Sequence, residues 1–471
     1  MVKRKRQSGK HGKTIDVRSA GLVLDDLPED VLWLIISRLP MRDAARTSIV
    51  SRKFKRIWRS YPKMSFDSVN ILNYQPESSQ GCISRSRTDK FIKNVDAVLQ
   101  QHSGQGVKEL KINFFLSKQY YDHVDRWVNF AVASKAEEIF LDLSPPSQNM
   151  IARNHERYNF PLHLFTNHDA SYMQGFHVKF ISLKLPPRFG GFKNLKALGL
   201  HSIDVTKEDL RCLLSNCYVL EWLKIYRCHH LCNLRIPHHL CQLQYLHVEQ
   251  CRFLETIELP AVNLANFTLK WQRVTSIVLG NSSRVTKACF YYLNSDALHY
   301  FLTRLPGDLP HVKTLYFELS WKNGTFEFPK RASIFVHLKH LDLTLYPGGK
   351  PGEGEDFLCL ASILEAAPYM EKFGLHVKQY IGSHPDYYYY KEEEKRRLPK
   401  CPHLYLRIVE ISGFFVSKDQ IELATHILNN ATVLEVMTLD PELNVFYKSI
   451  RKLAWKHLCR EVPHHAKLVI L

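Results

Sequence analysis

The sequence lacks long apolar runs and recognisable catalytic motifs. It has no stretch of about 18 apolar residues to cross a bilayer, and no apolar N-terminal segment of the kind that a secretory signal needs. Neither a Gly-x-Ser-x-Gly elbow nor a His-Glu-x-x-His helix occurs. We therefore expect a nuclear or cytoplasmic protein, or one found in both compartments, with no membrane partner and no catalytic residue of its own.

Acidic residues are also scarce relative to basic ones. The chain has 64 Lys and Arg against 46 Asp and Glu, a formal net charge of +18 that favours acidic partners such as nucleic acid. Residues 1–22 contain few apolar side chains, which predicts a disordered basic tail. Within it, Lys3, Arg4, Lys5 and Arg6 form a cluster typical of nuclear import. A nuclear repeat protein that binds nucleic acid or anions is one hypothesis, although no recognisable nucleic-acid-binding module is present.

Residues 24–66 predict three short helices. Asp26 is placed to cap the first helix, with Pro28 in its opening turn and Glu29 at the capping-box spacing. This helix is apolar around most of its circumference, so it must bury two faces, one of which is available to a partner. The second helix begins near Asp43. The third carries one apolar stripe, formed by Val50, Phe54, Ile57, Trp58 and Tyr61.

Three motifs in this region resemble an F-box. They are Leu27-Pro28-Glu29-Asp30, the Ile-Ser-Arg-Leu of residues 36–39, and Val50-Ser51-Arg52-Lys53 followed by Trp58. Phe54 stands where many members of the family carry Trp. The resemblance implies an F-box at residues 23–67 that binds a Skp1-type adaptor and, through it, the cullin and RING subunits of a ubiquitin ligase. The contact residues implied by position are Leu27, Pro28, Val31, Ile35, Leu39, Val50, Ser51, Phe54 and Trp58. The alternative is a helical cap for the repeats that follow.

An apolar pattern with offsets of zero, three and five residues recurs through the rest of the chain. Its clearest copies start at Leu195, Leu220, Leu243 and Leu264. Their spacings of 25, 23 and 21 residues lie within the range of about 20–29 for leucine-rich repeats. Weaker copies start at Val107, Ala136, Val312, Leu338, Met370, Leu406 and Leu434. The pattern predicts an α/β fold, in which a three-helix F-box precedes a curved leucine-rich-repeat solenoid with a parallel concave sheet.

The repeat body, predicted over residues 91–445, resembles that of plant F-box proteins with leucine-rich repeats. Residues 401–441 are similar to the FBD-like C-terminal region of those proteins. We expect residues 68–90 to form a linker and residues 446–471 a C-terminal cap or tail. The resemblance implies a non-catalytic, substrate-recognition adaptor whose repeats hold a protein target of unknown identity, without a cofactor.

Cysteine and histidine gather between Cys228 and Cys251, which raises the alternative of a zinc site. These two cysteines each lie eight residues after the first anchor of their repeat, where leucine-rich repeats place Asn or Cys in a bend. We therefore interpret them as structural thiols and predict no metal. Pro347–Gly354 lacks the spacing of a phosphate loop, and Tyr387–Tyr390 with the charged residues after it is interpreted as a polar insertion.

Overall fold

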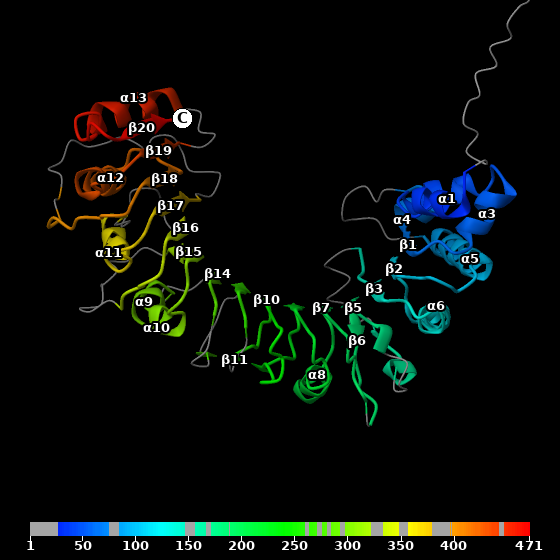
Figure 1. Ribbon diagram of the computed structural model, residues 1–471. Helices are drawn as coiled ribbons and strands as arrows, with labels where there is room; N and C mark the ends of the chain where they lie inside the picture. Colours follow the sequence, from blue (N-terminus) through cyan, green and yellow to red (C-terminus); the bar gives the residue numbers. More distant parts are fainter. Residues whose placement is uncertain are drawn as a thin grey trace, which may run out of the picture.

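A long parallel sheet runs through the molecule as an arc (Figure 1). The computed structural model describes residues 27–74, 84–146, 156–165, 171–187, 189–259, 263–270, 276–279, 284–292, 297–321, 333–347, 357–378, 396, 398–441 and 447–471. In Figure 1 the strands line the inner side of the arc and most helices lie on its outer side. The predicted α/β fold, with N-terminal helices followed by a curved solenoid and a parallel concave sheet, is confirmed.

The sheet has 15 strands, which are hydrogen-bonded in chain order. They are β1 (Lys63–Asp67), β2 (Glu109–Asn113), β3 (Glu138–Asp142), β5 (Gly175–Lys179), β7 (Ala197–His201), β8 (Trp222–Tyr226), β10 (Tyr245–Glu249), β12 (Asn266–Lys270), β14 (Lys287–Tyr292), β15 (Thr314–Trp321), β16 (His340–Pro347), β17 (Lys372–Val377), β18 (Ile408–Ser412), β19 (Val436–Asp440) and β20 (Lys467–Ile470).

The helices of the described residues fall into an N-terminal group and an outer layer. The first group is α1 (Glu29–Ile36), α2 (Met41–Thr47), α3 (Arg52–Trp58) and α4 (Ser68–Leu72). The outer layer comprises α5 (Arg85–Gln101), α6 (Tyr121–Ala133), α8 (Lys207–Leu214), α9 (Ala297–Thr303), α10 (Leu305–Asp308), α11 (Ala361–Glu365), α12 (Lys418–Asn430) and α13 (Tyr447–Leu458). Among the described residues, none of these helices is long and apolar enough to cross a membrane.

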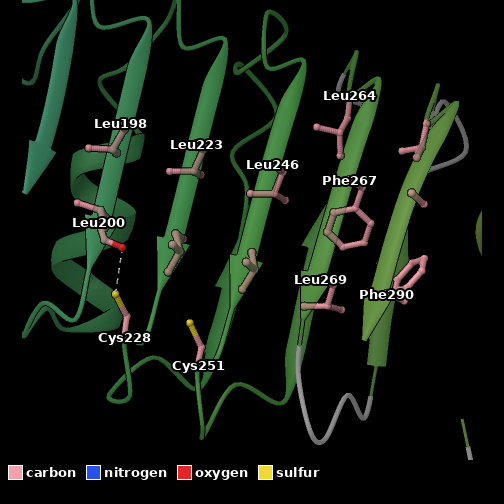
Figure 2. Packing of buried hydrophobic residues seen from close by; sticks show 14 of the residues in the cluster. Leu198, Leu200, Leu223, Cys228, Leu246, Cys251, Leu264, Phe267, Leu269 and Phe290 are labelled. Atoms are coloured by element: carbon pink, nitrogen blue, oxygen red, sulfur yellow. Dashed lines mark hydrogen bonds between the residues drawn. The ribbon is translucent and has the colours of Figure 1, made fainter. Parts of the chain in front are cut away.

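Alternating side chains explain the sheet. In β8, Leu223 and Ile225 are fully buried, while the residues between and beside them face the concave side. Leu223 pairs directly with Leu198 on one side and with Leu246 on the other, so equivalent leucines form a continuous row across the strands (Figure 2). Each such burial contributes about 1.5–3 kcal/mol, and no repeat achieves it without its neighbours.

All eleven predicted strands are present, and four more complete the sheet. The additional strands are β1, β5, β14 and β20. At β5 the offsets of zero, three and five are occupied by Met173, Phe176 and Val178, which are all buried. β1, β5 and β14 carry aromatic residues, Met, Val or Ala at these offsets, whereas β20 keeps Leu468 and Ile470 but has His465 at its first anchor.

The outer layer changes in the middle of the arc. There a second parallel sheet, formed by β9 (Asn233–Arg235), β11 (Thr256–Leu259) and β13 (Ser276–Leu279), replaces the helices. Repeat length explains the change, because the repeats that start at Leu220 and Leu243 have only 23 and 21 residues. An extended strand covers about 3.3 Å per residue and a helix only 1.5 Å, so a short repeat crosses the outer face as a strand.

Strands and helices also lie outside the predicted repeat body, residues 91–445, at both of its ends. β1 lies inside the range predicted for the F-box, yet it pairs with β2 over residues 63–67. Residues 68–90, expected as a linker, contain α4 and the first turn of α5. At the other end β20 pairs with β19 and α13 packs against α12, so residues 446–471 supply the last strand and helix. The repeats therefore extend beyond residues 91–445.

Buried thiols lie in the bends that follow β8 and β10. Cys228 Sγ donates a hydrogen bond to the carbonyl of Leu200 at 3.7 Å (Figure 2) and another to that of Tyr226 at 3.6 Å. Cys251 Sγ donates to the carbonyl of Glu249 at 3.6 Å. Burial raises the pKa of Cys228 to about 11 and also raises that of Cys251. Both thiols are therefore protonated donors in the bend, as their place in the repeat predicts. The described residues contain no group of three or more metal-binding side chains.

Candidate functional site

The N-terminal helices pack on the first repeat through one face each. Leu32 and Ile36 of α1, together with Phe54 and Trp58 of α3, are buried and belong to the core that continues through the array. Tyr61 donates a hydrogen bond to the carbonyl of Leu39 at 2.6 Å. Two further contacts, the ion pair of Glu29 with Arg56 and the hydrogen bond from Lys53 to the carbonyl of Leu27, tie α1 to α3.

A second apolar face of these helices remains exposed. Val31, Leu34 and Ile35 have helical i, i+3 and i+4 spacing on α1, and Leu34 is 48% exposed. Ile49 and Val50, between α2 and α3, are 85% and 74% exposed. We call these five residues the helical ridge. Exposed apolar surface of this kind is typical of interaction sites.

The structure divides the nine residues predicted as adaptor contacts into three groups. Pro28, Val31, Ile35 and Val50 are exposed. Leu27, Leu39 and Ser51 are half-buried. Phe54 and Trp58 are each only 6% exposed, so they support the fold of the module in this structure.

The burial of Phe54 and Trp58 has a simple cause. The predicted stripe of the third helix faces the core, and Val50 precedes α3 instead of continuing its stripe. Ser51 is the N-cap of α3, and its Oγ accepts a hydrogen bond from the Phe54 amide at 3.3 Å. Similarly, α2 begins at Met41 and Pro28 is the N-cap of α1. Asp26 and the import cluster Lys3–Arg6 lie outside the described residues.

Two residues of the helical ridge were not predicted as contacts: Leu34 and Ile49. The i+3 spacing from Val31 was a signal for Leu34. Ile49 follows a helix by two residues, and no periodic pattern assigns a face to a residue in such a connection.

The concave sheet carries a second candidate surface on β3, β5, β8 and β10. Phe140 stacks on His177 with ring centroids 4.4 Å apart. The ring centroids of His177 and Trp222 are 5.6 Å apart. Trp222 stacks in turn on Tyr245 at 5.6 Å, with the two rings 4° from parallel. We call these four residues the aromatic ladder. His177 remains uncharged at neutral pH, because burial lowers its pKa to about 4.

Carboxylates border the aromatic ladder on its N-terminal side. Glu109 of β2 and Glu138 of β3 are direct cross-strand partners, and Glu137 adjoins them in the chain. Burial and the negative charges of Glu109 and Glu137 raise the pKa of Glu138, more than Lys63 lowers it. We call these three glutamates the acidic corner. Like charges directly opposite each other destabilise a sheet, and Lys63, the direct partner of Glu109 on its other side, offsets part of this repulsion.

A shallow hollow opens at the rim beside these groups. It has a volume of about 510 Å³, and its charged lining consists of Glu137, Glu221 and Lys196. Gln174 and Tyr172 also line it. The hollow is close in volume to small-molecule and peptide side-chain sites.

Comparisons with known proteins agree with the class that the fold and the ridge define, a leucine-rich-repeat protein with an F-box at its N-terminal end. The F-box domain matches residues 24–65, and the leucine-rich-repeat domain of the At1g61320/AtMIF1 type matches residues 98–466. Because the second match covers most of the chain, the protein belongs to the At1g61320/AtMIF1 leucine-rich-repeat family.

The chain is also similar to curated proteins of Arabidopsis thaliana. It is 29% identical to the F-box/FBD/LRR-repeat protein At1g13570 over 203 residues, which cover 43% of each chain. It is 25% identical to the F-box/LRR-repeat protein At3g03360 over 221 residues, 45% of this chain and 40% of that protein. The matched part thus spans about two fifths of those relatives. The putative F-box/FBD/LRR-repeat protein At4g13965 is 22% identical over 456 residues, 89% of this chain and 91% of that protein. The predicted resemblance to plant F-box proteins with leucine-rich repeats is confirmed.

Proposed function

We propose that this protein is the substrate-recognition subunit of an SCF-type ubiquitin ligase. The observation that carries the proposal is an F-box whose helices keep an exposed apolar ridge although their other faces are packed on the repeats. The ridge binds a Skp1-type adaptor, and through it the cullin and RING subunits. The concave sheet holds a protein target.

The ridge has the chemistry of a helix-in-groove contact. Val31, Leu34 and Ile35 form the i, i+3, i+4 anchors by which an amphipathic helix enters an apolar groove. Arg38, Arg46 and Arg52 are exposed on the same group of helices. A partner groove with an apolar floor and an acidic rim therefore fits this end of the molecule.

Proximity is the contribution of such a subunit to ubiquitin transfer. The chain belongs to a family of adaptor type, and we assign it no catalytic residue. Its two surfaces lie at different places on one continuous core, with the ridge at the N-terminal end of the arc and the sheet on its inner side (Figure 1). A rigid link of this kind raises the effective concentration of target lysines near the ubiquitin thioester carried by other subunits.

The test is co-purification of the full chain with a Skp1-type adaptor. Replacing Leu34 and Ile35 together by Asp should lower the recovery of adaptor at least ten-fold, because a charge enters the apolar groove. The matched control is Tyr218→Asp with Phe253→Asp, which alters two residues of similar exposure on the repeats, 50% and 59%.

Both double variants should keep the circular dichroism and unfolding midpoint of the parent, since the altered side chains are exposed. Undiminished adaptor recovery by the ridge variant, or equal losses from both variants, would contradict the proposal. We further propose that Lys3–Arg6 direct nuclear entry. Replacing all four by Ala should then shift a fluorescent fusion toward the cytoplasm.

A further inference from the structure

The turns that lead into β16, β17, β18 and β19 carry exposed apolar residues. Two of these turns are closed by backbone hydrogen bonds, from the Met370 amide to the carbonyl of Ala367 at 3.1 Å and from the Leu434 amide to that of Ala431 at 3.4 Å. The two central residues of each turn are exposed. Five of them are large and apolar, with exposed fractions between 39% and 58%: Val336, Tyr369, Leu404, Tyr405 and Val433. We call these five residues the turn patch.

The turn patch is one continuous surface. The strands β16 to β19 pair in parallel, and their register places the turns before them side by side. The rings of Tyr369 and Tyr405, from neighbouring turns, have centroids 5.4 Å apart. Three strand spacings of about 4.8 Å give the patch a length of about 14 Å, close to three turns of a helix. Single apolar residues are normal on a protein surface, but a contiguous row of them is typical of an interaction site.

The turn patch also continues onto the concave face. Ile408 and Val436, at the start of β18 and β19, are direct cross-strand partners. Ile408 is 38% exposed and Val436 is half-buried. They follow Tyr405 and Val433 by three residues each. The patch is therefore continuous with the sheet on which we propose that the target binds.

Folding of the turns does not require apolar residues at these positions. The turn before β7 has Lys193 and Asn194 at its centre, and the turn before β10 has Cys241 and Gln242. Both turns are closed by the same backbone hydrogen bond, at 3.1 and 3.2 Å. Small or polar residues are the usual choice in such turns. The fold thus leaves the central turn positions free for another role.

The charged residues between the turn patch and the concave face are paired with one another. Lys339 forms an ion pair with Glu371 at 2.7 Å, and Arg407 forms one with Glu435 at 2.9 Å. The hydrogen bond from Lys339 also lowers the pKa of Glu371. A charged partner segment would lose hydration here and meet charges that are already paired, whereas an apolar segment gains from burial. An apolar centre with a polar border is the usual anatomy of a protein interface.

A second copy of this chain is a poor occupant of the turn patch. Each copy carries a formal net charge of +18, so two copies repel each other, most strongly at low salt. A different protein with an uncharged apolar segment meets no such repulsion. The charge of the chain therefore favours a target protein over self-association.

We propose that the turn patch binds an apolar segment of the target protein, one that carries leucine or aromatic side chains. The inference rests on the proposed function for the existence of a target, and it names the chemistry that selects the target. The segment lies along the turns before β16 to β19 and extends onto Ile408 and Val436. In Figure 1 these strands belong to the arm of the arc opposite the helical ridge, so adaptor and target occupy separate ends of the molecule.

The test uses the full chain and two fluorescein-labelled amphipathic peptides of about 15 residues, enough for four helical turns. Both peptides have no net charge, and one carries leucine at the i, i+3, i+4 and i+7 positions where the other carries glutamine. Fluorescence anisotropy should show binding of the leucine peptide only, with an affinity that added salt does not reduce. Replacing Leu404 and Tyr405 together by Ser should weaken binding about ten-fold or more, the scale of losing two contacts at the centre of an interface.

Two matched controls locate the binding. Tyr218→Ser with Val219→Ser alters the equivalent turn before β8 and should leave the affinity for the leucine peptide unchanged. Leu34→Asp with Ile35→Asp alters the helical ridge and should also leave it unchanged. All three double variants should keep the unfolding midpoint of the parent, since the altered side chains are exposed or half-buried.

Several results would overturn the inference. They are equal affinity for the two peptides, no binding of the leucine peptide at millimolar concentration, equal losses from the two turn variants, or loss of binding in the ridge variant. A concentration-dependent dimer in sedimentation velocity that the Leu404 and Tyr405 variant abolishes would assign the patch to a second copy instead.

The same preparations are tested for adaptor recovery, which separates this inference from the proposed function. Adaptor recovery without leucine-peptide binding refutes the turn patch as a binding site and leaves the proposed function intact. Leucine-peptide binding without adaptor recovery refutes the adaptor role and leaves the patch as a site for apolar peptides.

Discussion

The helical module, residues 27–67, and the repeat array use the same apolar residue types in opposite ways. In the array Leu198, Leu223 and Leu246 are fully buried, because each lies between equivalent residues of two neighbouring repeats. In the module Ile49 and Val50 are mostly exposed. The array needs its apolar residues to fold, whereas the module carries more apolar surface than its own packing uses. The exposed apolar surface of the module lies at the N-terminal end of the arc, where we propose that the adaptor binds.

The two regions also differ in how they tolerate acid. Residues 27–67 contain no histidine, while the array buries several. Burial lowers the pKa of His177, His201 and His403 to about 4 each. The array therefore depends on uncharged imidazoles that the module does not have.

The largest expected effect separates the two uses of apolar residues. Leu223→Ala should lower the free energy of unfolding by about 2–5 kcal/mol, because it opens a cavity in the continuous row of leucines. Ile49→Ala should change it by less than about 0.5 kcal/mol, since the side chain is already in water. Guanidinium denaturation followed by circular dichroism measures both. A comparable loss from both variants would show that Ile49 is part of the core and would remove the basis for the ridge.

Acidification should produce the next largest effect, and it should affect the array only. A histidine with a folded-state pKa below its unfolded value of about 6.5 binds protons more readily when unfolded. The stability it supports is complete above about pH 6.5 and is lost as pH falls toward 4. For His403, which is 6% exposed, the loss is about 2 kcal/mol at pH 5.

Hydrogen exchange at pH 7 and pH 5, corrected for intrinsic rates, localises this effect. Protection should fall in the array, including α12, whose His426 and Asn430 contact His403, and should persist in α1 and α3. The matched variant is His403→Leu, which removes the titrating group and a ring nitrogen, Nε2, that has no hydrogen-bond partner among the described residues. It should flatten the pH dependence. A steeper loss in the module than in the array would reverse the comparison.

Sequence patterns predicted the array well because its information is local. Each strand is marked by one anchor and two buried residues within six positions, so the sequence predicts each of the eleven strands separately. Strand β5 was not predicted, although Met173, Phe176 and Val178 occupy the same offsets. A seven-residue helix is too short to show from sequence which of its faces is covered, so the contact roles of Phe54 and Trp58 stay a prediction.

The concave site could not be predicted in the same way. Glu138 and Trp222 are far apart in sequence, and only the register of the intervening strands places them in one row. Only Gly175 and Ala197 separate Glu138 from Trp222 in this row. Small residues such as these give no sequence pattern that would predict the arrangement. A repeat pattern fixes which residues face the concave side. It does not fix which of them meet.

The smallest expected effect concerns the helix caps, of which each region has a similar example. Ser51 Oγ accepts from the Phe54 amide at the start of α3, and Ser417 Oγ accepts from the Gln420 amide at the start of α12. Changing either serine to Ala should cost about 1 kcal/mol. Only the change at Ser51 should also reduce adaptor recovery, because it loosens the helix start next to Ile49 and Val50.

Aspartate distinguishes a cap from a direct contact at this position. Asp caps helices as well as Ser does, so Ser51→Asp should restore both stability and adaptor recovery if Ser51 acts by holding α3 in place. Recovery of stability without recovery of adaptor binding would instead make Ser51 a contact residue whose added charge the partner rejects. Ser417→Asp is the control, since it should restore stability and leave adaptor recovery at the parent level throughout. The pair of serines thus tests whether the exposed end of the arc depends on its own fold or on the fit of single side chains.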